Sequence, residues 1–293
     1  MKEYNNYLIE LNSEDGYALD GYIHKSNEEN NKKVLIAIHG MTSNCFKKKD
    51  KIIANEMEKL NIDTICFNNR GSEIIKRVKD KDGNAKVFGS AFEDVRESYY
   101  DITGAIEYAI NQGYEEIYLQ GHSLGSTKLL YSYNRMIKEK YKYLKNIKAI
   151  ILLSLVDIKD MFNSGLSKKH LHIIKHLVKT NKGDTLIPTH NFIEYMTAKN
   201  IIDYAENKEL DLVQYSDKNC KYEYLNNIKI PLFMRWGTVN ELIKLPPKEQ
   251  AEMINNKVKN PNKDINYIEG GTHSYEGKEE VLAKEIKEFL NKI

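Results

Sequence analysis

Ser123 stands between two glycines in the pentapeptide GHSLG, which covers residues 121–125. The apolar run EEIYLQG before it predicts a buried strand, and STKLLYSYNRMI after it predicts a helix. A corner this sharp holds the serine in strained dihedrals, and flanking glycines avoid collisions with neighbouring backbone. The serine oxygen then projects at the positive end of the helix, where a nucleophile is expected.

A serine hydroxyl is a weak nucleophile unless a base takes its proton. His273, in the stretch EGGTHSY, lies on a glycine-rich loop between the last predicted strand and the last predicted helix. An order of serine first and histidine last along the chain is typical of triads built on the corner described above. His273 is therefore the predicted base.

The charge that develops on an attacked carbonyl oxygen needs two backbone N–H groups aimed at it. Leu124 directly follows the nucleophile and supplies one predicted donor. Met41 carries the first free amide of the turn that follows the apolar run VLIAIHG, and it supplies the other. The predicted chemistry is acyl transfer through a covalent intermediate on Ser123.

The elements that must position these residues alternate along the chain. YLIEL and YALDGYIH bracket a turn and predict an antiparallel hairpin. Continuous apolar runs predict buried strands, and amphipathic segments such as residues 102–110 predict helices between them. This alternation favours an α/β fold, a mostly parallel twisted sheet with helices on both faces.

The alternation stops after Asp157 and resumes near residue 228. We expect residues 157–227 to form a small helical cap inserted over the carboxyl edge of the sheet, where ligands bind in such folds. Residues 1–156 and 228–293 are then the α/β core.

Six stretches together resemble α/β-hydrolase-fold serine hydrolases along nearly the whole chain: AIHGMTSN, FNNRG, YLQGHSLGS, LLSLVD, MRWGTVNELIKLP and GGTHSY. The sequence is most similar to a carboxylesterase-like branch that includes fungal siderophore-ester hydrolases. The resemblance implies a hydrolase of a small or medium carboxylic ester, thioester or lactone, with an acyl-enzyme on Ser123.

The resemblance also implies an acid in a form like W-G-x-x-D, but Asn240 occupies that position here. Three residues compete for the role of triad acid. Glu241 is one residue further on and has a longer side chain; Asp157 ends an earlier strand; Asn240 can orient an imidazole but cannot stabilise its positive charge. An asparagine in place of the acid costs about 10⁴ in turnover.

Two other functions use the same residues. An acyltransferase would replace water by another alcohol or amine. A non-catalytic ligand-binding homologue would explain Asn240, although such a protein has no physical need for Ser123 or His273.

Composition and cysteine usage favour a cytoplasmic protein in a reducing compartment, and we expect a monomer or a homodimer. The formal charge of the 293 residues is +2, and three cysteines lack a CxxC pattern. No apolar run reaches membrane-spanning length, so no membrane partner is expected. The run Lys47-Lys48-Lys49 is interpreted as the solvated end of a helix, and no nucleic-acid partner is expected.

No metal or cofactor is expected. His172 and His176 have the spacing of a metal pair, but the stretch HIIKH lacks the glutamate of H-E-x-x-H. No phosphate-binding loop and no dinucleotide fingerprint occur. Arg70, after a buried strand, is expected to form a structural ion pair rather than a substrate contact.

Overall fold

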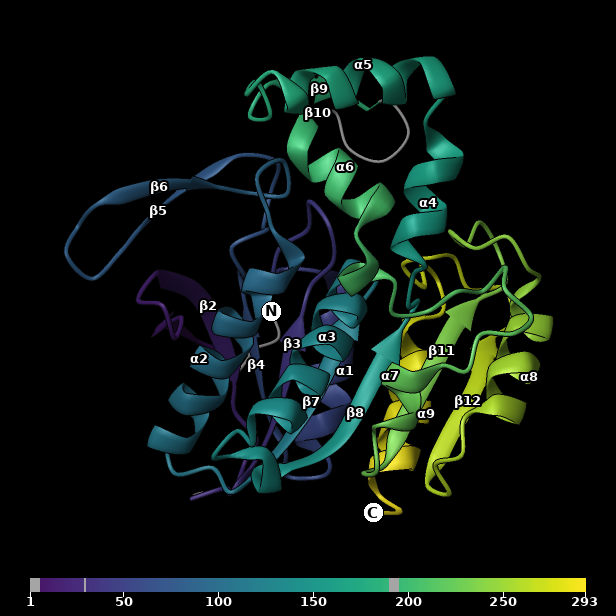
Figure 1. Cartoon of the computed structure of the whole chain (residues 1–293). Helices are drawn as coiled ribbons and strands as arrows, with labels where there is room; N and C mark the ends of the chain where they lie inside the picture. The colour runs from purple at the N-terminus through teal and green to yellow at the C-terminus, as the bar shows by residue number, and fades with distance from the viewer. Residues whose placement is uncertain (1–5, 29, 190–194) are drawn as a thin grey trace.

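A twisted eight-stranded sheet forms the centre of the computed structural model, which describes residues 6–28, 30–189 and 195–293 (Figure 1). The strand order is β1-β2-β4-β3-β7-β8-β11-β12. β1 and β2 form the predicted antiparallel hairpin, β2 pairs antiparallel with β4, and every later pairing is parallel. The prediction of a mostly parallel α/β sheet is confirmed. The strands are β1 (Asn6–Asn12), β2 (Ala18–His24), β3 (Lys33–Ile38), β4 (Asp63–Phe67), β7 (Glu116–His122), β8 (Ile147–Leu153), β11 (Leu232–Gly237) and β12 (Lys263–Ile268).

Helices cover both faces of this sheet. On one face lie α1 (Lys48–Glu58) and α9 (Glu279–Leu290). The other face is covered by α2 (Ser98–Asn111), α3 (Leu124–Glu139), α7 (Glu223–Asn226) and α8 (Pro247–Lys257). Short 3₁₀ turns are η1 (Val95–Glu97), η2 (Leu144–Asn146) and η3 (Lys208–Leu210).

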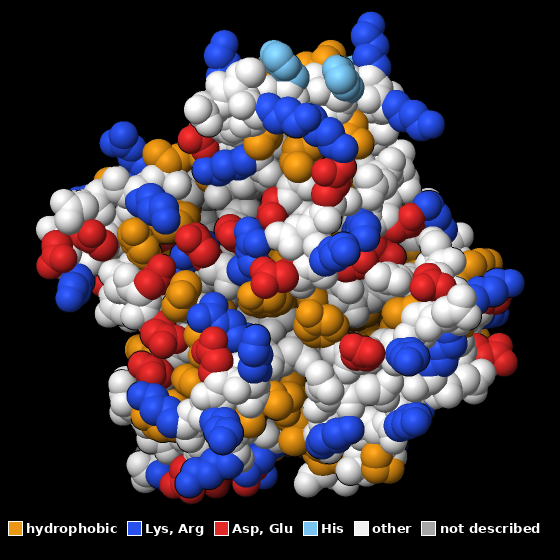
Figure 2. All heavy atoms as spheres, viewed as in Figure 1, with side chains coloured by type: hydrophobic (Ala, Val, Ile, Leu, Met, Phe, Trp, Pro, Cys, Tyr) orange, Lys and Arg blue, Asp and Glu red, His pale blue; other side chains and the backbone are white. Residues whose placement is uncertain are grey.

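A separate lobe stands above the carboxyl edge of the sheet (Figure 1). It consists of α4 (Ile158–Gly165), α5 (Lys168–Lys179), β9 (Leu186–Pro188), β10 (Tyr195–Thr197) and α6 (Ala198–Glu206). Lys and His side chains gather at its top (Figure 2). Its apolar side chains share one cluster, whereas Leu212, Tyr215 and Leu225 pack into the main core. The division at residues 157 and 227 stays a prediction.

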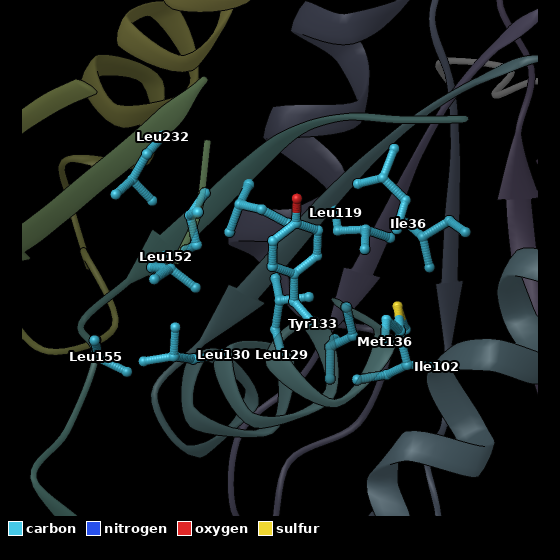
Figure 3. Close-up of a cluster of buried hydrophobic side chains, with 14 of the residues drawn as sticks. Ile36, Ile102, Leu119, Leu129, Leu130, Tyr133, Met136, Leu152, Leu155 and Leu232 are labelled. Carbon is cyan, nitrogen blue, oxygen red and sulfur yellow. The ribbon is translucent and has the colours of Figure 1, made fainter. Parts of the chain in front are cut away.

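Strand alternation sends neighbouring side chains to opposite faces and so builds two cores. In β3, Ile36 packs on the α2/α3 face, whereas Leu35 packs on the α1/α9 face. Figure 3 shows side chains of α3, among them Leu129 and Met136, against the sheet residues of the first face. Burial on both faces explains why the central strands are continuous apolar runs.

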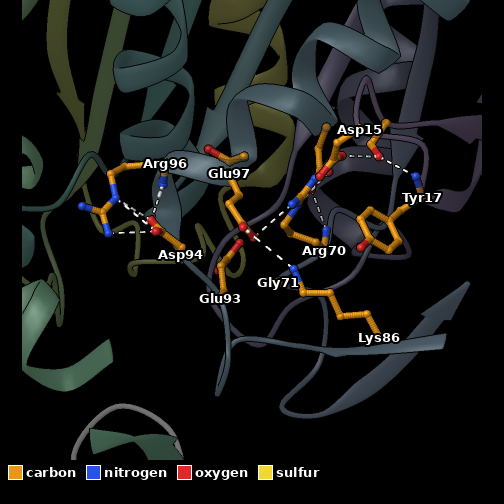
Figure 4. A network of polar contacts seen from close by, with 12 residues as sticks. Asp15, Tyr17, Arg70, Gly71, Lys86, Glu93, Asp94, Arg96 and Glu97 are labelled. Atoms are coloured by element: carbon orange, nitrogen blue, oxygen red, sulfur yellow. Dashed lines mark hydrogen bonds and ion pairs between the residues drawn. The ribbon is translucent and has the colours of Figure 1, made fainter. Parts of the chain in front are cut away.

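Arg70 follows β4 and is fully buried in an ion-pair network. Its guanidinium nitrogens lie 2.8 Å from Asp101 Oδ1, 2.7 Å from Asp15 Oδ1 and 3.0 Å from Glu97 Oε2 (Figure 4). The prediction of a structural ion pair is confirmed. A two-stranded hairpin, β5 (Lys76–Lys79) and β6 (Ala85–Phe88), extends from the body near this network.

None of the helices that the structure describes has both the length and the apolar character needed to cross a bilayer.

Candidate active site

Ser123 forms the corner between β7 and α3 with φ 55° and ψ −127°. A Cβ on Gly121 would lie 2.4 Å from the carbonyl oxygen of Gly125, and one on Gly125 would lie 2.3 Å from that of Ile38. Both glycines are therefore required by close backbone approach. The strained serine is held by its own amide, which donates to Leu153 O at 2.8 Å.

His273 lies between Ser123 and Glu241. Its Nδ1 is 2.7 Å from Glu241 Oε2, and its Nε2 is 2.8 Å from Ser123 Oγ. Because a carboxylate only accepts, Nδ1 carries the proton and Nε2 is free to accept from the serine hydroxyl. The side chain of Glu241 is 2% exposed and that of His273 is 19% exposed, so the pair is largely shielded from water.

Besides His273, three donors hold the Glu241 carboxylate. Oε1 accepts from Ser154 Oγ at 2.6 Å and from the amide of Gly237 at 2.8 Å. Oε2 also accepts from the Leu242 amide at 3.3 Å. Hydrogen bonds of this kind stabilise the charged carboxylate and fix its direction.

The structure does not bring the other two candidate acids to His273. Asn240 is exposed and has a φ of 52°, so its main chain turns Glu241 toward the site. Asp157 caps α4, accepting from the Asp160 amide at 2.9 Å, and also accepts from the Tyr215 amide at 3.1 Å. Burial raises the pKa of Asp157 to about 6.

Met41 and Leu124, whose amides are the predicted oxyanion donors, line the same pocket as Ser123. Leu124 opens α3, so its N–H has no acceptor one turn earlier in the helix. The turn before Met41 is fastened by His39: the Asn69 amide donates to His39 Nε2 at 3.2 Å, which leaves Nδ1 to donate to Gly40 O at 2.9 Å. Burial lowers the pKa of His39 well below its usual value, in agreement with this neutral ring.

His122 and Ser154 also take part in the site, although neither is predicted from the sequence. His122 Nε2 donates to the carbonyl oxygen of His273 at 2.8 Å, and Ser154 Oγ lies 3.1 Å from the same oxygen. Burial lowers the pKa of His122 well below its usual value, so the ring stays neutral and Nε2 carries the proton. Tyr275 OH lies 3.0 Å from Ser154 Oγ and donates to Arg235 O at 2.8 Å. No local pattern marks these residues, because each contact joins distant parts of the chain.

A pocket of about 650 Å³ opens at Ser123 and is lined by both apolar and charged residues. The apolar lining residues are Met41, Leu124, Val156, Met161 and Leu242, of which the first four belong to one apolar cluster. The charged lining residues are Lys47, Lys48, Lys49, Asp50, Glu276 and Glu279, among which Lys48 pairs with Glu279 and Lys49 with Asp50.

The prediction that Lys47, Lys48 and Lys49 are a solvated run is wrong for one of them. Lys47 and Lys48 are exposed, but Lys49 is buried. Burial is tolerated because its ammonium pairs with Asp50, whose carboxylate also accepts from Gln120 Nε2 at 3.2 Å.

Within the described residues, no group of three or more His, Cys, Asp or Glu side chains is arranged to hold a metal ion. His172 and His176 lie exposed on α5.

No model of a known protein family matches the sequence, and no curated protein matches it. Solved structures do match along almost the whole chain. Est1E from Butyrivibrio proteoclasticus is 16% identical with a TM-score of 0.67, covering 97% of this chain and 98% of its own. The esterase Pf2001 from Pyrococcus furiosus is 17% identical with a TM-score of 0.61, covering 99% of this chain and 91% of its own. A soluble variant of monoglyceride lipase from Saccharomyces cerevisiae is 14% identical with a TM-score of 0.62, covering 96% and 94%. This chain therefore has the α/β-hydrolase fold.

Proposed function

We propose that this protein is a serine hydrolase that cleaves small or medium carboxylic esters, thioesters or lactones. The observation that carries the proposal is the hydrogen-bonded series Ser123–His273–Glu241 at the wall of a pocket. Structures named as an esterase and a lipase share the fold and support the same class of reaction.

In the proposed first step, Ser123 Oγ attacks the carbonyl carbon while its proton passes to His273 Nε2. The 2.8 Å separation of these atoms suits a direct transfer. The amides of Met41 and Leu124 stabilise the oxyanion, and the imidazolium then protonates the leaving alcohol or thiol. Water, deprotonated by His273, attacks the acyl-enzyme, and collapse of that intermediate returns the proton to Ser123.

Glu241 is the proposed acid of the triad. Its charge stabilises the imidazolium that forms in each step, and its contact with Nδ1 fixes the tautomer that leaves Nε2 basic. Asn240 contributes its backbone turn, and Asp157 contributes a helix cap.

The apolar and the charged lining residues of the pocket suit the two parts of an ester. The apolar wall around Met161 and Val156 suits an acyl chain, because the transfer of apolar surface out of water is favourable. The charged wall around Lys47 and Glu276 suits the more polar leaving group. A volume of about 650 Å³ accommodates a substrate of small or medium size.

The test is labelling by a fluorophosphonate alongside hydrolysis of p-nitrophenyl acetate and butyrate. Wild type should label and turn over, and Ser123→Ala should do neither. Ser274→Ala is the matched control, because Ser274 is another serine of the same pocket wall. Wild-type protein that neither labels nor turns over any of these esters would overturn the proposal and favour a ligand-binding homologue. Labelling with release of product only when an acceptor alcohol is added would favour the acyltransferase.

A further inference from the structure

Helix α5 has two faces of opposite character. Its inner face packs Ile174, Leu177 and Val178 into the apolar cluster that it shares with α6. Its outer face is exposed and consists of Lys168, Lys169, His172, Ile173, His176 and Lys179. Spacings of three and four residues place these six side chains on one side of the helix.

The outer face carries positive charge that no acid balances. The chain has no Asp or Glu between residues 161 and 183. Lys175 pairs with Glu206 at 2.5 Å, on the side toward α6. Among the described residues, none forms an ion pair with Lys168, Lys169 or Lys179. In Figure 2 the blue and pale blue side chains stand at the top of the lobe, where Figure 1 places α5.

Apolar side chains are exposed on the same lobe. Ile173 is 49% exposed among the lysines of α5, Leu186 on β9 is 37% exposed and Tyr195 on β10 is 48% exposed. Strand alternation explains the last two, since their neighbours Ile187 and Met196 point into the cluster of the lobe.

We propose that the outer face of α5 docks this protein on an anionic membrane surface. Lysines near such a surface each contribute favourably through the negative potential of the headgroups, and exposed apolar side chains reach the headgroup boundary. Since the apolar face of α5 is already buried against α6, the helix lies on the bilayer without inserting. The binding is therefore peripheral and sensitive to salt.

A lipid surface fits this face better than a nucleic acid does. The face has no arginine for bidentate phosphate contacts and no Phe, Tyr or Trp ring on which bases could stack. The expectation of no membrane partner rested on the lack of a spanning run, which does not bear on docking by a folded surface.

The experiment is flotation of the full chain with vesicles of phosphatidylcholine, with and without about 30% phosphatidylglycerol, at about 0.1 M and about 0.5 M salt. Wild type should bind only the anionic vesicles and should dissociate at the higher salt. Lys168→Glu/Lys169→Glu/Lys179→Glu should weaken binding at least about 100-fold. The matched control, Lys218→Glu/Lys259→Glu/Lys292→Glu, changes net charge equally at exposed lysines outside the lobe and should still bind.

Ile173→Ser should weaken binding by a smaller factor, because it removes apolar contact and leaves the charge. Turnover of a soluble ester and the circular dichroism spectrum show whether each variant is folded. Three outcomes would overturn the proposal: folded wild type that does not bind the vesicles at all, an α5 triple variant that keeps its binding, or an equal loss of binding in both triple variants. So would binding to duplex DNA without binding to anionic vesicles.

Discussion

Ser154 Oγ lies 2.6 Å from Glu241 Oε1, and this contact joins the end of β8 to the loop after β11. Ser154 is fully buried and has a φ of 47°, so its hydroxyl is held in one direction by a strained backbone. The Gly237 amide donates to the same carboxylate oxygen at 2.8 Å. Glu241 stands one residue beyond the usual acid position, and these two donors fix its longer side chain against His273.

Ser154→Ala and Ser154→Gly should each lower kcat about 10-fold or more and leave KM nearly unchanged. The physical reason is the loss of one hydrogen bond to a charged group, which loosens the direction of Glu241. Fluorophosphonate labelling should slow in parallel. Glycine suits the positive φ, so a loss in both variants assigns the effect to the hydroxyl.

Ser132→Ala is the control for this experiment, since Ser132 is also a buried serine and its hydroxyl has no partner among the described residues. It should keep wild-type kcat. A change in KM alone in the Ser154 variants would contradict the positioning role.

Glu241→Gln should lower kcat by about 10⁴, because an amide cannot stabilise the imidazolium and can hold the wrong tautomer. Asn240→Gly keeps the positive φ of the turn and should stay within about threefold of wild type. Steady-state kinetics on p-nitrophenyl butyrate measure both. Equal losses in the two variants would show that Asn240 takes part in the chemistry.

Much of this arrangement follows from local sequence. Buried apolar runs predict the strands, and the glycine pair around Ser123 predicts the corner, because both patterns reflect contacts within a few residues. The choice between Asn240 and Glu241 does not follow from the sequence. It depends on one backbone dihedral, the 52° φ of Asn240, and on how far the glutamate side chain extends.

Contacts between residues at the carboxyl edge of the sheet could not be predicted from the sequence either. His122 donates to the carbonyl oxygen of a residue 151 positions away, and Ser154 donates to the carboxylate of a residue 87 positions away. Lys49 looked solvated because it belongs to a run of three lysines, and only the fold shows that it is buried beside Asp50.

Asp157→Asn should leave turnover nearly unchanged and alter the dependence of stability on pH. Burial raises the pKa of Asp157 from 3.8 to about 6, so the folded state favours the protonated acid. That stabilisation is fully present below pH 3.8 and is lost as pH rises through 6. The free energy of unfolding of wild type should therefore fall, relative to the asparagine variant, by about 2 kcal/mol between about pH 4 and pH 7.

Urea titrations at several pH values measure this difference for Asp157. If the free energy of unfolding changed with pH in the same way for wild type and variant, the carboxyl would titrate alike in the folded and unfolded chain. A loss of turnover as large as that of Glu241→Gln would instead return Asp157 to the list of triad acids.

Gly125→Ala should damage stability and catalysis together. The new Cβ would lie 2.3 Å from Ile38 O and 2.7 Å from His39 O, and both are backbone atoms that cannot rotate away. The chain leading to Met41 must then shift, which moves a proposed oxyanion donor. Overpacking of this kind costs about 3 kcal/mol, so Tm should fall by about 5–10 °C.

Gly183→Ala is the control for Gly125→Ala, because its Cβ would meet only Lys199, with Cβ at 3.3 Å and Cδ at 4.0 Å. That variant should keep its Tm within about 2 °C and its full turnover. If Gly125→Ala matched it in both measurements, the close approach of β3 to the serine corner would not be what requires glycine there.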